Sequence, residues 1–183
     1  MRRRDVIAGL AGLATVGGGL SLLAAGSGGR GVEPAELETV EAPGSPAGTV
    51  SVPARGRVSL VTFFATWCHV CEAEMTALAS VAERRDESVQ QVSVTNEPVG
   101  HSVTRTAVRD WWREHGGSWP VALDADLALT EAMEVSGVPT LVVLDADNVV
   151  TWRHTGRAAA ATLLDELAAA RDPTTGEPEL EAV

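Results

Sequence analysis

The spacing of apolar residues along the chain predicts a sheet whose central strands are buried on both faces. Residues 58–65, VSLVTFFA, are almost continuously apolar and β-branched, a pattern typical of such a strand. Two pairs of extended segments are separated by short turns rich in Gly, Pro, Asp or Asn, which indicates hairpins. In chain order, the predicted extended segments are residues 37–42, 49–54, 58–65, 88–96, 120–124, 140–145 and 149–154.

Helical periodicity predicts four helices. The first begins near Cys68 and carries apolar residues at helical spacing, namely Met75, Leu78, Ala79 and Ala82. The second is expected to run from a cap at Ser102 to His115, where Gly116 and Gly117 end it. Its predicted apolar side consists of Val103, Ala107, Val108, Trp111 and Trp112.

The last two helices complete an α/β pattern. One is expected from a cap at Asp126 to Met133, and the other over residues 158–171 with its leucines inward. The order of elements predicts a central mixed sheet with helices on both faces, an N-terminal β-hairpin and one inserted helix.

Composition restricts the possible partners. The 183 residues suffice for one domain with a hydrophobic core. The formal net charge is −11, with 25 acidic residues, and all 14 basic residues are arginine. A phosphate backbone would be repelled, which argues against nucleic-acid binding. A lysine-free, acid-rich surface resembles proteins adapted to high salt. The alternative is an acidic protein from a GC-rich genome, in which codon bias replaces lysine with arginine.

The first 29 residues are typical of an export signal or of an uncleaved membrane anchor. Residues 2–4 are arginines, and residues 6–29 carry no charge. The sequence RRDVI at residues 3–7 resembles the twin-arginine export pattern. We therefore expect the protein outside the cytoplasm, at the outer face of the membrane or extracellular, where disulfides persist. Membrane contact is expected only through this segment.

The rest of the chain divides into three parts. Residues 30–36 are expected to form a linker and residues 37–171 the folded domain. Residues 172–183 have no core-forming pattern, so we expect an acidic, disordered tail.

Cys68 and Cys71 are the only cysteines of the chain, and three kinds of role suit their spacing. A structural disulfide is disfavoured because it would close very little chain. A structural zinc ion needs about four ligands, and the four histidines show no ligand spacing. They are His69, His101, His115 and His154. No bound metal is therefore expected, although soft thiolates bind Cu(I), so copper handling stays open.

Redox exchange is the favoured role. Cys68 follows the predicted central strand at the start of a helix, where exposed N–H groups and the helix dipole favour a thiolate. Cys68 would attack a substrate disulfide, and Cys71 would resolve the mixed disulfide.

The segment FFATWCHVCEAEM, residues 63–75, resembles the active site of the thioredoxin superfamily. It is more similar still to the exported TlpA/ResA/DsbE-type thiol–disulfide oxidoreductases. The sequence GVPT follows at residues 137–140, and residues 118–156 agree with that family's pattern nearly element by element. The resemblance covers about residues 36–170. It implies a thioredoxin-like three-layer fold with the family's inserted helix, and no bound cofactor.

The resemblance also implies substrate-binding residues. Pro139 matches the family's cis-proline beside the cysteines, which would leave the Val138 backbone free to pair with an extended substrate. An ordinary trans proline is the alternative. Trp67 matches a tryptophan that flanks the first cysteine and shapes the docking surface, and core packing alone is the alternative.

A proton relay is implied for Glu74, which matches a glutamate of the ResA-like subgroup. It would carry protons to and from Cys71 if partial burial raised its pKa. A solvated glutamate is the alternative, and that role is expected for Glu72 and Glu83.

Two positions depart from the family pattern. Thr62 stands six residues before Cys68, where thioredoxin has a buried aspartate, so proton transfer depends more heavily on Glu74. The residues between the cysteines are His69 and Val70, without the proline of many relatives. A protonated His69 would tune the thiolate's pKa and make the disulfide more oxidising, and an exposed bystander is the alternative.

Together these features predict an extracytoplasmic thiol–disulfide oxidoreductase that acts on proteins with disulfides or dithiols. The resemblance implies a reductase for the haem-site cysteines of apocytochrome c or for misoxidised exported proteins. A membrane electron-transfer protein would supply its electrons. A dithiol oxidase and a Cu(I)-handling chaperone remain alternatives. A thiol peroxidase is disfavoured because its Pro-x-x-x-Thr-x-x-Cys setting is absent.

Overall fold

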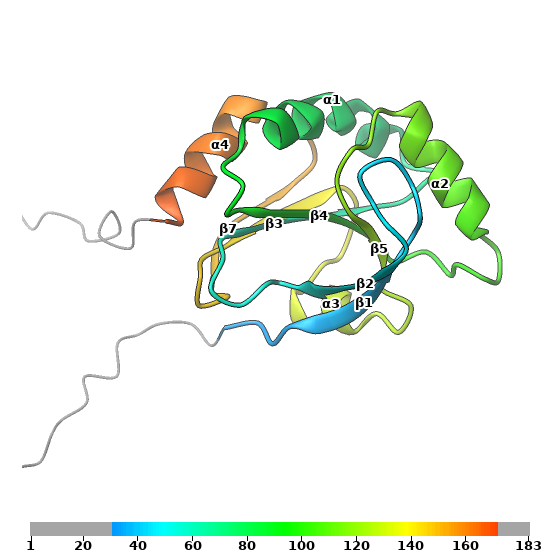
Figure 1. Ribbon diagram of the computed structural model, residues 1–183, viewed down its shortest axis with the longest axis horizontal. Coiled ribbons are helices and arrows are strands. Elements are labelled where there is room, and N and C mark those ends of the chain that lie inside the picture. Colours follow the sequence, from blue (N-terminus) through cyan, green and yellow to red (C-terminus); the bar gives the residue numbers. More distant parts are fainter. Residues whose placement is uncertain (1–30, 172–183) are drawn as a thin grey trace, which may run out of the picture.

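The computed structural model describes residues 31–171, which form a seven-stranded sheet and four helices (Figure 1). The predicted signal segment and the predicted tail lie outside the described residues. The strands are β1 Ala35–Thr39, β2 Gly48–Val52, β3 Ser59–Phe64, β4 Gln90–Thr95, β5 Val121–Leu123, β6 Thr140–Leu144 and β7 Val150–Thr155. The helices are α1 His69–Arg84, α2 Arg105–Glu114, α3 Ala128–Ala132 and α4 Ala160–Ala169. None of these four helices has the length and apolar character needed to cross a bilayer.

Strand β3 lies inside the sheet and leads directly into the CxxC segment. The strand order is β2-β1-β5-β4-β3-β6-β7. β3 pairs in parallel with β4 and antiparallel with β6, so the sheet is mixed. Every residue of β3 is buried, as its continuous apolar run predicts. The two predicted hairpins, β1–β2 and β6–β7, form the outer parts of the sheet.

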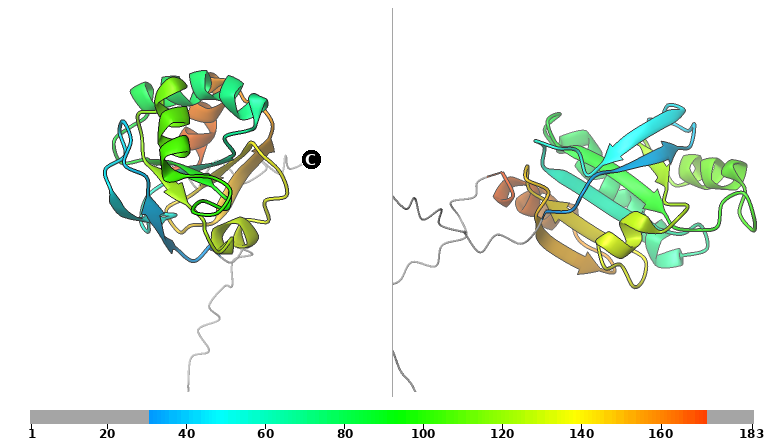
Figure 2. Two further views of the ribbon diagram at one scale, coloured as in Figure 1. Left: turned by 90° about the vertical axis from the view of Figure 1, so that its right-hand side faces the viewer. Right: turned by 90° about the horizontal axis from the view of Figure 1, so that it is seen from below.

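Helices cover both faces of the sheet in three layers (Figure 1; Figure 2). Helices α1, α2 and α4 lie on one face, and α3 lies on the other. Successive β3 side chains point to opposite faces and therefore join different cores. The core under α1 and α4 includes Leu60, Phe64, Met75, Leu78 and Leu163. The core beside α3 includes Val61, Phe63, Leu129 and Met133. The predicted mixed sheet with helices on both faces is confirmed.

The inserted helix α2 begins later than its sequence pattern predicts. Thr104 is the N-cap in place of Ser102, and its Oγ1 accepts a hydrogen bond of 3.0 Å from the Ala107 N–H. The chain before it closes a tight turn, in which the Gly100 N–H donates to the Val103 carbonyl at 2.7 Å. Ser102 lies in this turn and therefore cannot cap the helix.

Aromatic side chains fix α2 against the sheet. The Trp111 ring stacks on Phe64 with 4.9 Å between centroids, and Trp112 meets Trp119 edge to face at 4.9 Å. Ala107, predicted on the apolar side, is exposed instead. Because Phe64 ends β3, these contacts hold α2 close to the strand that leads to Cys68.

Helix α3 is shorter than predicted. Leu127, with a left-handed backbone (φ 62°), separates the predicted cap Asp126 from the helix, which ends at Ala132. The main anchor is Asp124, a buried carboxylate that the sequence pattern did not indicate. It accepts hydrogen bonds from the backbone N–H and the hydroxyl of Thr130 at 2.7 and 2.6 Å.

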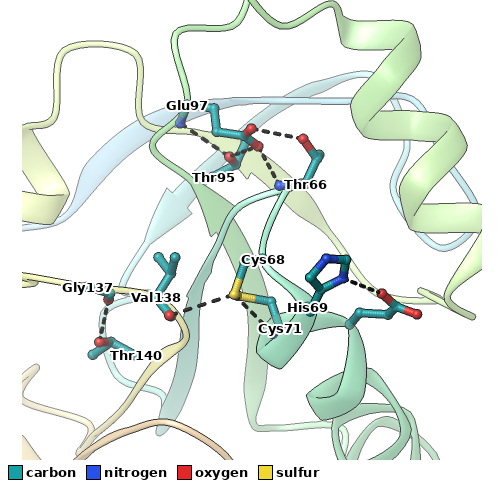
Figure 3. The surroundings of a disulfide bond; sticks show 10 residues. Thr66, Cys68, His69, Cys71, Thr95, Glu97, Gly137, Val138 and Thr140 are labelled. Carbon is teal, nitrogen blue, oxygen red and sulfur yellow. Dashed lines mark hydrogen bonds and ion pairs between the residues drawn. A yellow bond between two sulfur atoms is a disulfide. The ribbon is translucent and has the colours of Figure 1, made fainter.

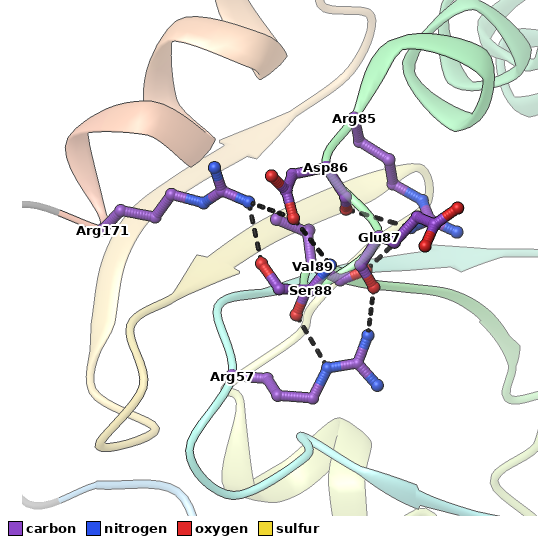
Figure 4. A network of polar contacts seen from close by, with 7 residues as sticks. All are labelled: Arg57, Arg85, Asp86, Glu87, Ser88, Val89 and Arg171. Atoms are coloured by element: carbon purple, nitrogen blue, oxygen red, sulfur yellow. Dashed lines mark hydrogen bonds and ion pairs between the residues drawn. The ribbon is translucent and has the colours of Figure 1, made fainter.

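An arginine network ties together the end of the molecule opposite Cys68 (Figure 4). Arg57, just before β3, donates from Nε to the Ser88 carbonyl at 2.7 Å. Arg171, after α4, donates to Ser88 Oγ at 2.9 Å and lies 3.1 Å from the carboxylate of Asp86. Hydrogen bonds from Ser88, together with Arg171, lower the pKa of Asp86 to about 2. The start of β3 is thereby joined to the ends of α1 and α4.

Candidate active site

Cys68 and Cys71 lie where β3 leads into α1, and they form a disulfide with their Cα atoms 5.2 Å apart (Figure 3). Cys68 is the N-cap residue of α1, and its Sγ accepts a hydrogen bond of 3.1 Å from the Cys71 N–H. N–H groups in the first turn of a helix lack partners within the helix, and the dipole there favours negative charge. The same donor is therefore placed to stabilise a Cys68 thiolate. Cys68 is 7% exposed and Cys71 2% exposed, so Cys68 is the more accessible of the two residues.

The Val138–Pro139 segment lies directly beside Cys68. The peptide bond between these two residues is cis. The carbonyl oxygen of Val138 is 3.7 Å from the Cys68 Sγ (Figure 3). Among the backbone–backbone hydrogen bonds of residues 31–171, none uses the N–H or the carbonyl of Val138. An extended peptide laid along this segment would find both groups free.

Glu74 is one turn after Cys71 on the buried side of α1, and it is 1% exposed. Both of its carboxyl oxygens accept from the single N–H of Ala158, at 3.2 and 3.1 Å. Burial raises the pKa of Glu74, and the Ala158 N–H and the charges of Arg157 and His154 oppose that rise. Side chains three residues apart on a helix are neighbours, so Glu74 and Cys71 lie side by side on the buried face of α1.

Trp67 and His69 flank Cys68 at the surface. Trp67 is 71% exposed, which contradicts core packing as its role. The side chain of His69 is 96% exposed, and its Nδ1 lies 3.5 Å from the carboxylate of Glu72 (Figure 3). Glu72 and Glu83 are both exposed, as their predicted solvation requires. The structure therefore exposes both side chains that flank Cys68, an indole ring on one side and an imidazole on the other.

The histidines near the cysteines do not complete a metal site. His69 and His115 each approach Glu72 at 3.5 Å. Within residues 31–171, however, no three His, Cys, Asp or Glu side chains are grouped closely enough to hold a metal ion.

Glu97 lies beside the segment that leads to Cys68, although no motif indicated it. Its carboxylate is buried and accepts hydrogen bonds from Thr66 and Thr95 (Figure 3). One signal could have found it: an acid two residues beyond a buried strand that is parallel to β3. The carboxyl ends of neighbouring parallel strands meet at one edge of a sheet. Thr62 is also buried, and its hydroxyl has no hydrogen-bond partner among the described residues.

Comparison with known protein families finds that residues 33–167 match Redoxin. The chain belongs to the redoxin family. The matched residues include Cys68, Cys71, Glu74 and Pro139. The thiol-disulfide oxidoreductase ResA from Bacillus subtilis (strain 168) is 28% identical over 112 residues, which cover 61% of this chain and 60% of ResA. The thiol:disulfide interchange protein DsbE from Escherichia coli (strain K12) is 27% identical over 129 residues, covering 70% of this chain and 65% of DsbE. The aligned part therefore spans less than two thirds of either relative.

A solved structure shares the fold. StoA from Bacillus subtilis superimposes with a TM-score of 0.64 at 20% sequence identity, covering 75% of this chain and 98% of StoA. The expected resemblance to the TlpA/ResA/DsbE type and the thioredoxin-like three-layer fold are confirmed.

Proposed function

We propose that this redoxin is an extracytoplasmic thiol–disulfide oxidoreductase that exchanges the Cys68–Cys71 disulfide with protein substrates and acts as a reductase. The observation that carries the proposal is the hydrogen bond from the Cys71 N–H to Cys68 Sγ at the N-terminus of α1. This donor lowers the free energy of the thiolate, which is both the attacking and the leaving form in exchange. The oxidoreductase relatives support the same chemistry.

The reductive reaction has two steps. The Cys68 thiolate attacks one sulfur of a substrate disulfide, whose S–S bond breaks as its other sulfur leaves as a thiolate. Cys71 then loses its proton and attacks Cys68 Sγ, which releases the second substrate thiolate and forms the Cys68–Cys71 disulfide. Two electrons pass from the protein to the substrate, and both substrate thiolates take protons from solvent or a nearby acid.

Four residues around the sulfurs serve these steps. Glu74 accepts the Cys71 proton before the second attack, since it is a buried base of raised pKa one turn away. The free backbone groups of Val138 pair with the substrate chain beside the cis Pro139. Trp67 offers an exposed apolar ring to the substrate. His69, when protonated, stabilises the Cys68 thiolate from the surface.

The cellular role follows from the resemblance and the N-terminal sequence. The twin-arginine-like RRDVI and the uncharged run after it support export of the chain. We place the protein at the outer face of the cytoplasmic membrane or outside the cell. There it would reduce apocytochrome c haem-site cysteines or misoxidised exported proteins with electrons from a membrane electron-transfer protein. Its acidic, lysine-free composition supports a high-salt environment.

Trapping tests the exchange. In the full-length chain, Cys71→Ser removes the resolving sulfur, so mixed disulfides with substrate proteins should accumulate through Cys68. They should be visible on non-reducing gels and identifiable by mass spectrometry. Cys68→Ser is the control and should accumulate none. If Cys71→Ser captures nothing under oxidising conditions while Cys68 still reacts with iodoacetamide, the proposed exchange is refuted.

The reduction potential tests the direction. A reductase should have a value near that of thioredoxin, about −270 mV, and an oxidase a value near that of DsbA, about −120 mV. The potential is measured by equilibrating the protein with glutathione or dithiothreitol buffers of defined ratio. A value near −120 mV would replace the reductase with a dithiol oxidase.

A further inference from the structure

The Glu97 carboxylate accepts three hydrogen bonds, two of them from the segment that leads to Cys68, and the exchange steps above do not use it. The residue is 5% exposed and lies two residues beyond β4. Its Oε2 accepts from the Thr66 backbone N–H at 2.8 Å and from Thr95 Oγ1 at 3.0 Å. Its Oε1 accepts from Thr66 Oγ1 at 2.9 Å (Figure 3). The Glu97 carboxylate thus binds both the backbone N–H and the hydroxyl of Thr66, and it links Thr66 to the end of β4.

Thr66 occupies a critical place in the chain. It lies between the end of β3 and Cys68, and the next residue, Trp67, is exposed. Two other backbone hydrogen bonds hold the connection from β3 to α1: the Cys68 N–H donates to the Ala65 carbonyl, and the Glu72 N–H donates to the Cys68 carbonyl, both at 3.1 Å. Movement of Thr66 would therefore displace both the Trp67 ring and the Cys68 sulfur relative to the Val138 backbone, which lies on a different loop.

We propose that Glu97 is a positioning residue for disulfide exchange: by binding Thr66 it sets the orientation of Cys68 and Trp67 toward a polypeptide substrate lying along Val138. The inference rests on the proposed exchange function and adds the group that aligns its nucleophile. A misplacement of about 1 Å at a reacting atom can cost about a hundredfold in rate.

The hydrogen-bond geometry separates alignment from charge. Only the Thr66 N–H is obliged to donate, because both threonine hydroxyls can rotate and accept. A glutamine at position 97 could accept from the Thr66 N–H and the Thr95 hydroxyl through its oxygen, and donate from its NH₂ to Thr66 Oγ1. Glu97→Gln therefore keeps the three bonds without the negative charge, whereas Glu97→Leu removes all three acceptors.

The experiment measures the rate at which the reduced full-length protein reduces a fluorescent peptide cyclised through a Cys–Cys disulfide. Glu97→Gln should react within about twofold of wild type, and Glu97→Leu about tenfold more slowly. The pH midpoint of Cys68 alkylation by iodoacetamide reports the stability of the thiolate and not its alignment, so it should be the same in all three proteins if Glu97 acts only by positioning Thr66. Hydrogen exchange of the Thr66 amide should be about tenfold faster in Glu97→Leu and unchanged in Glu97→Gln.

Asp124→Leu is a matched control. Asp124 is also a buried carboxylate that accepts three hydrogen bonds, but it holds α3. The Asp124→Leu variant should be less stable than wild type but should reduce the cyclic peptide at nearly the wild-type rate. If Glu97→Leu does not fold, Thr66→Val, which loses only the bond to Oε1, should still slow the peptide reaction about threefold.

Three results would overturn the inference: a normal peptide rate in Glu97→Leu, a Glu97→Gln protein as slow as Glu97→Leu, or a shifted alkylation midpoint in Glu97→Gln. A wild-type protein that never reduces the peptide would refute the proposed function instead. Hydrogen exchange of the Thr66 amide would then still test whether Glu97 restrains this segment. An unchanged exchange rate in Glu97→Leu would refute the restraint.

Discussion

Among single residues, Glu74 is the one whose proton chemistry depends most on the fold. Its carboxyl group is buried, and a single backbone N–H, from Ala158, serves both oxygens. Burial raises its pKa above the ordinary value despite this donor and the nearby Arg157. The folded protein therefore binds a proton at Glu74 at pH values where the unfolded chain has lost it.

This difference predicts how stability changes with pH. Where the folded state binds more protons than the unfolded state, the free energy of unfolding falls as pH rises. Wild type should thus lose stability as pH rises from Glu74's ordinary pKa through its raised one. Glu74→Gln removes that loss, so its stability relative to wild type should increase over the same pH window. Below that window, the two proteins should have the same stability. A difference of one pH unit between the two pKa values corresponds to about 1.4 kcal/mol.

The measurement is urea unfolding of the oxidised proteins between pH 4 and 8, where the disulfide prevents the cysteines from titrating. Glu72→Gln is the control, because Glu72 lies on the same helix and is exposed. Its stability relative to wild type should stay flat with pH. Parallel curves for Glu74→Gln and wild type would mean that the pKa of Glu74 is the same in the folded and unfolded states.

Part of the site could be predicted from the sequence because its signals are local. The spacing of Cys68 and Cys71 behind an apolar strand indicates their place at a helix N-terminus, and the structure puts them there. Pro139 was found only through family resemblance. Glu97 was missed because its role depends on β3 and β4 ending side by side, and no local pattern contains that pairing.

Among the elements, α2 shows how an inserted helix is fixed onto the sheet. Trp112 is fully buried, donates from Nε1 to the Pro43 carbonyl at 3.2 Å, and packs against Trp119. A Cβ at Gly117 would lie 2.2 Å from the Trp112 ring. Since the ring is held on several sides, it has little room to move. Gly117 is therefore required for packing, whereas Gly116 before it, with φ 75°, suits the left-handed backbone that ends α2.

Gly117→Ala should destabilise the fold by about 1–3 kcal/mol, the usual cost of overpacking. Urea unfolding at fixed pH measures it. Gly137→Ala is the matched control, because a Cβ there meets nothing within 4 Å, and its stability should change little. Equal stability of the two variants would show that the Trp112 ring can shift at low cost.

The strands were easier to predict than the helix ends. β3 and the β6–β7 hairpin are marked by apolar residues and by turn residues, and they lie where expected. The first hairpin also forms, but β1 spans Ala35–Thr39, so it begins inside the predicted linker and ends before the predicted residue 42. The starts of α2 and α3 were misplaced, because Ser102 and Asp126 are good caps by residue type. Ser102 lies in the turn before α2, and the left-handed Leu127 stands between Asp126 and α3, although Asp126 Oδ1 still accepts a hydrogen bond from the Ala128 N–H.

Across the whole molecule, charge is the dominant surface property. The net charge is −11, so the folded chain carries repulsion that salt can screen. The Debye length falls from about 10 Å at 0.1 M salt to about 3 Å at 1 M. The compact state, which holds these charges closer together than the unfolded chain, should therefore gain stability as NaCl is added.

Thermal unfolding at pH 7.5 should show a melting temperature that rises by several degrees between about 0.1 and 1 M NaCl. The same titration near pH 4.7, the sequence isoelectric point, is the control and should show a much smaller rise. A rise of equal size at both pH values would assign the effect to salt-enhanced burial of apolar surface instead.

The two ends of the described chain enter the fold on the side remote from the sulfurs. The Val32 N–H donates to the Asn148 carbonyl at the β6–β7 turn, and Arg171 contacts Ser88, both near the start of β3 (Figure 1). Cys68 comes after the far end of that strand. A bead, an electrode or a fused protein attached at residue 31 or residue 171 would therefore contact the domain on the side remote from Cys68. A monolayer grafted through either position would thus turn its reactive thiols outward, toward the bathing solution.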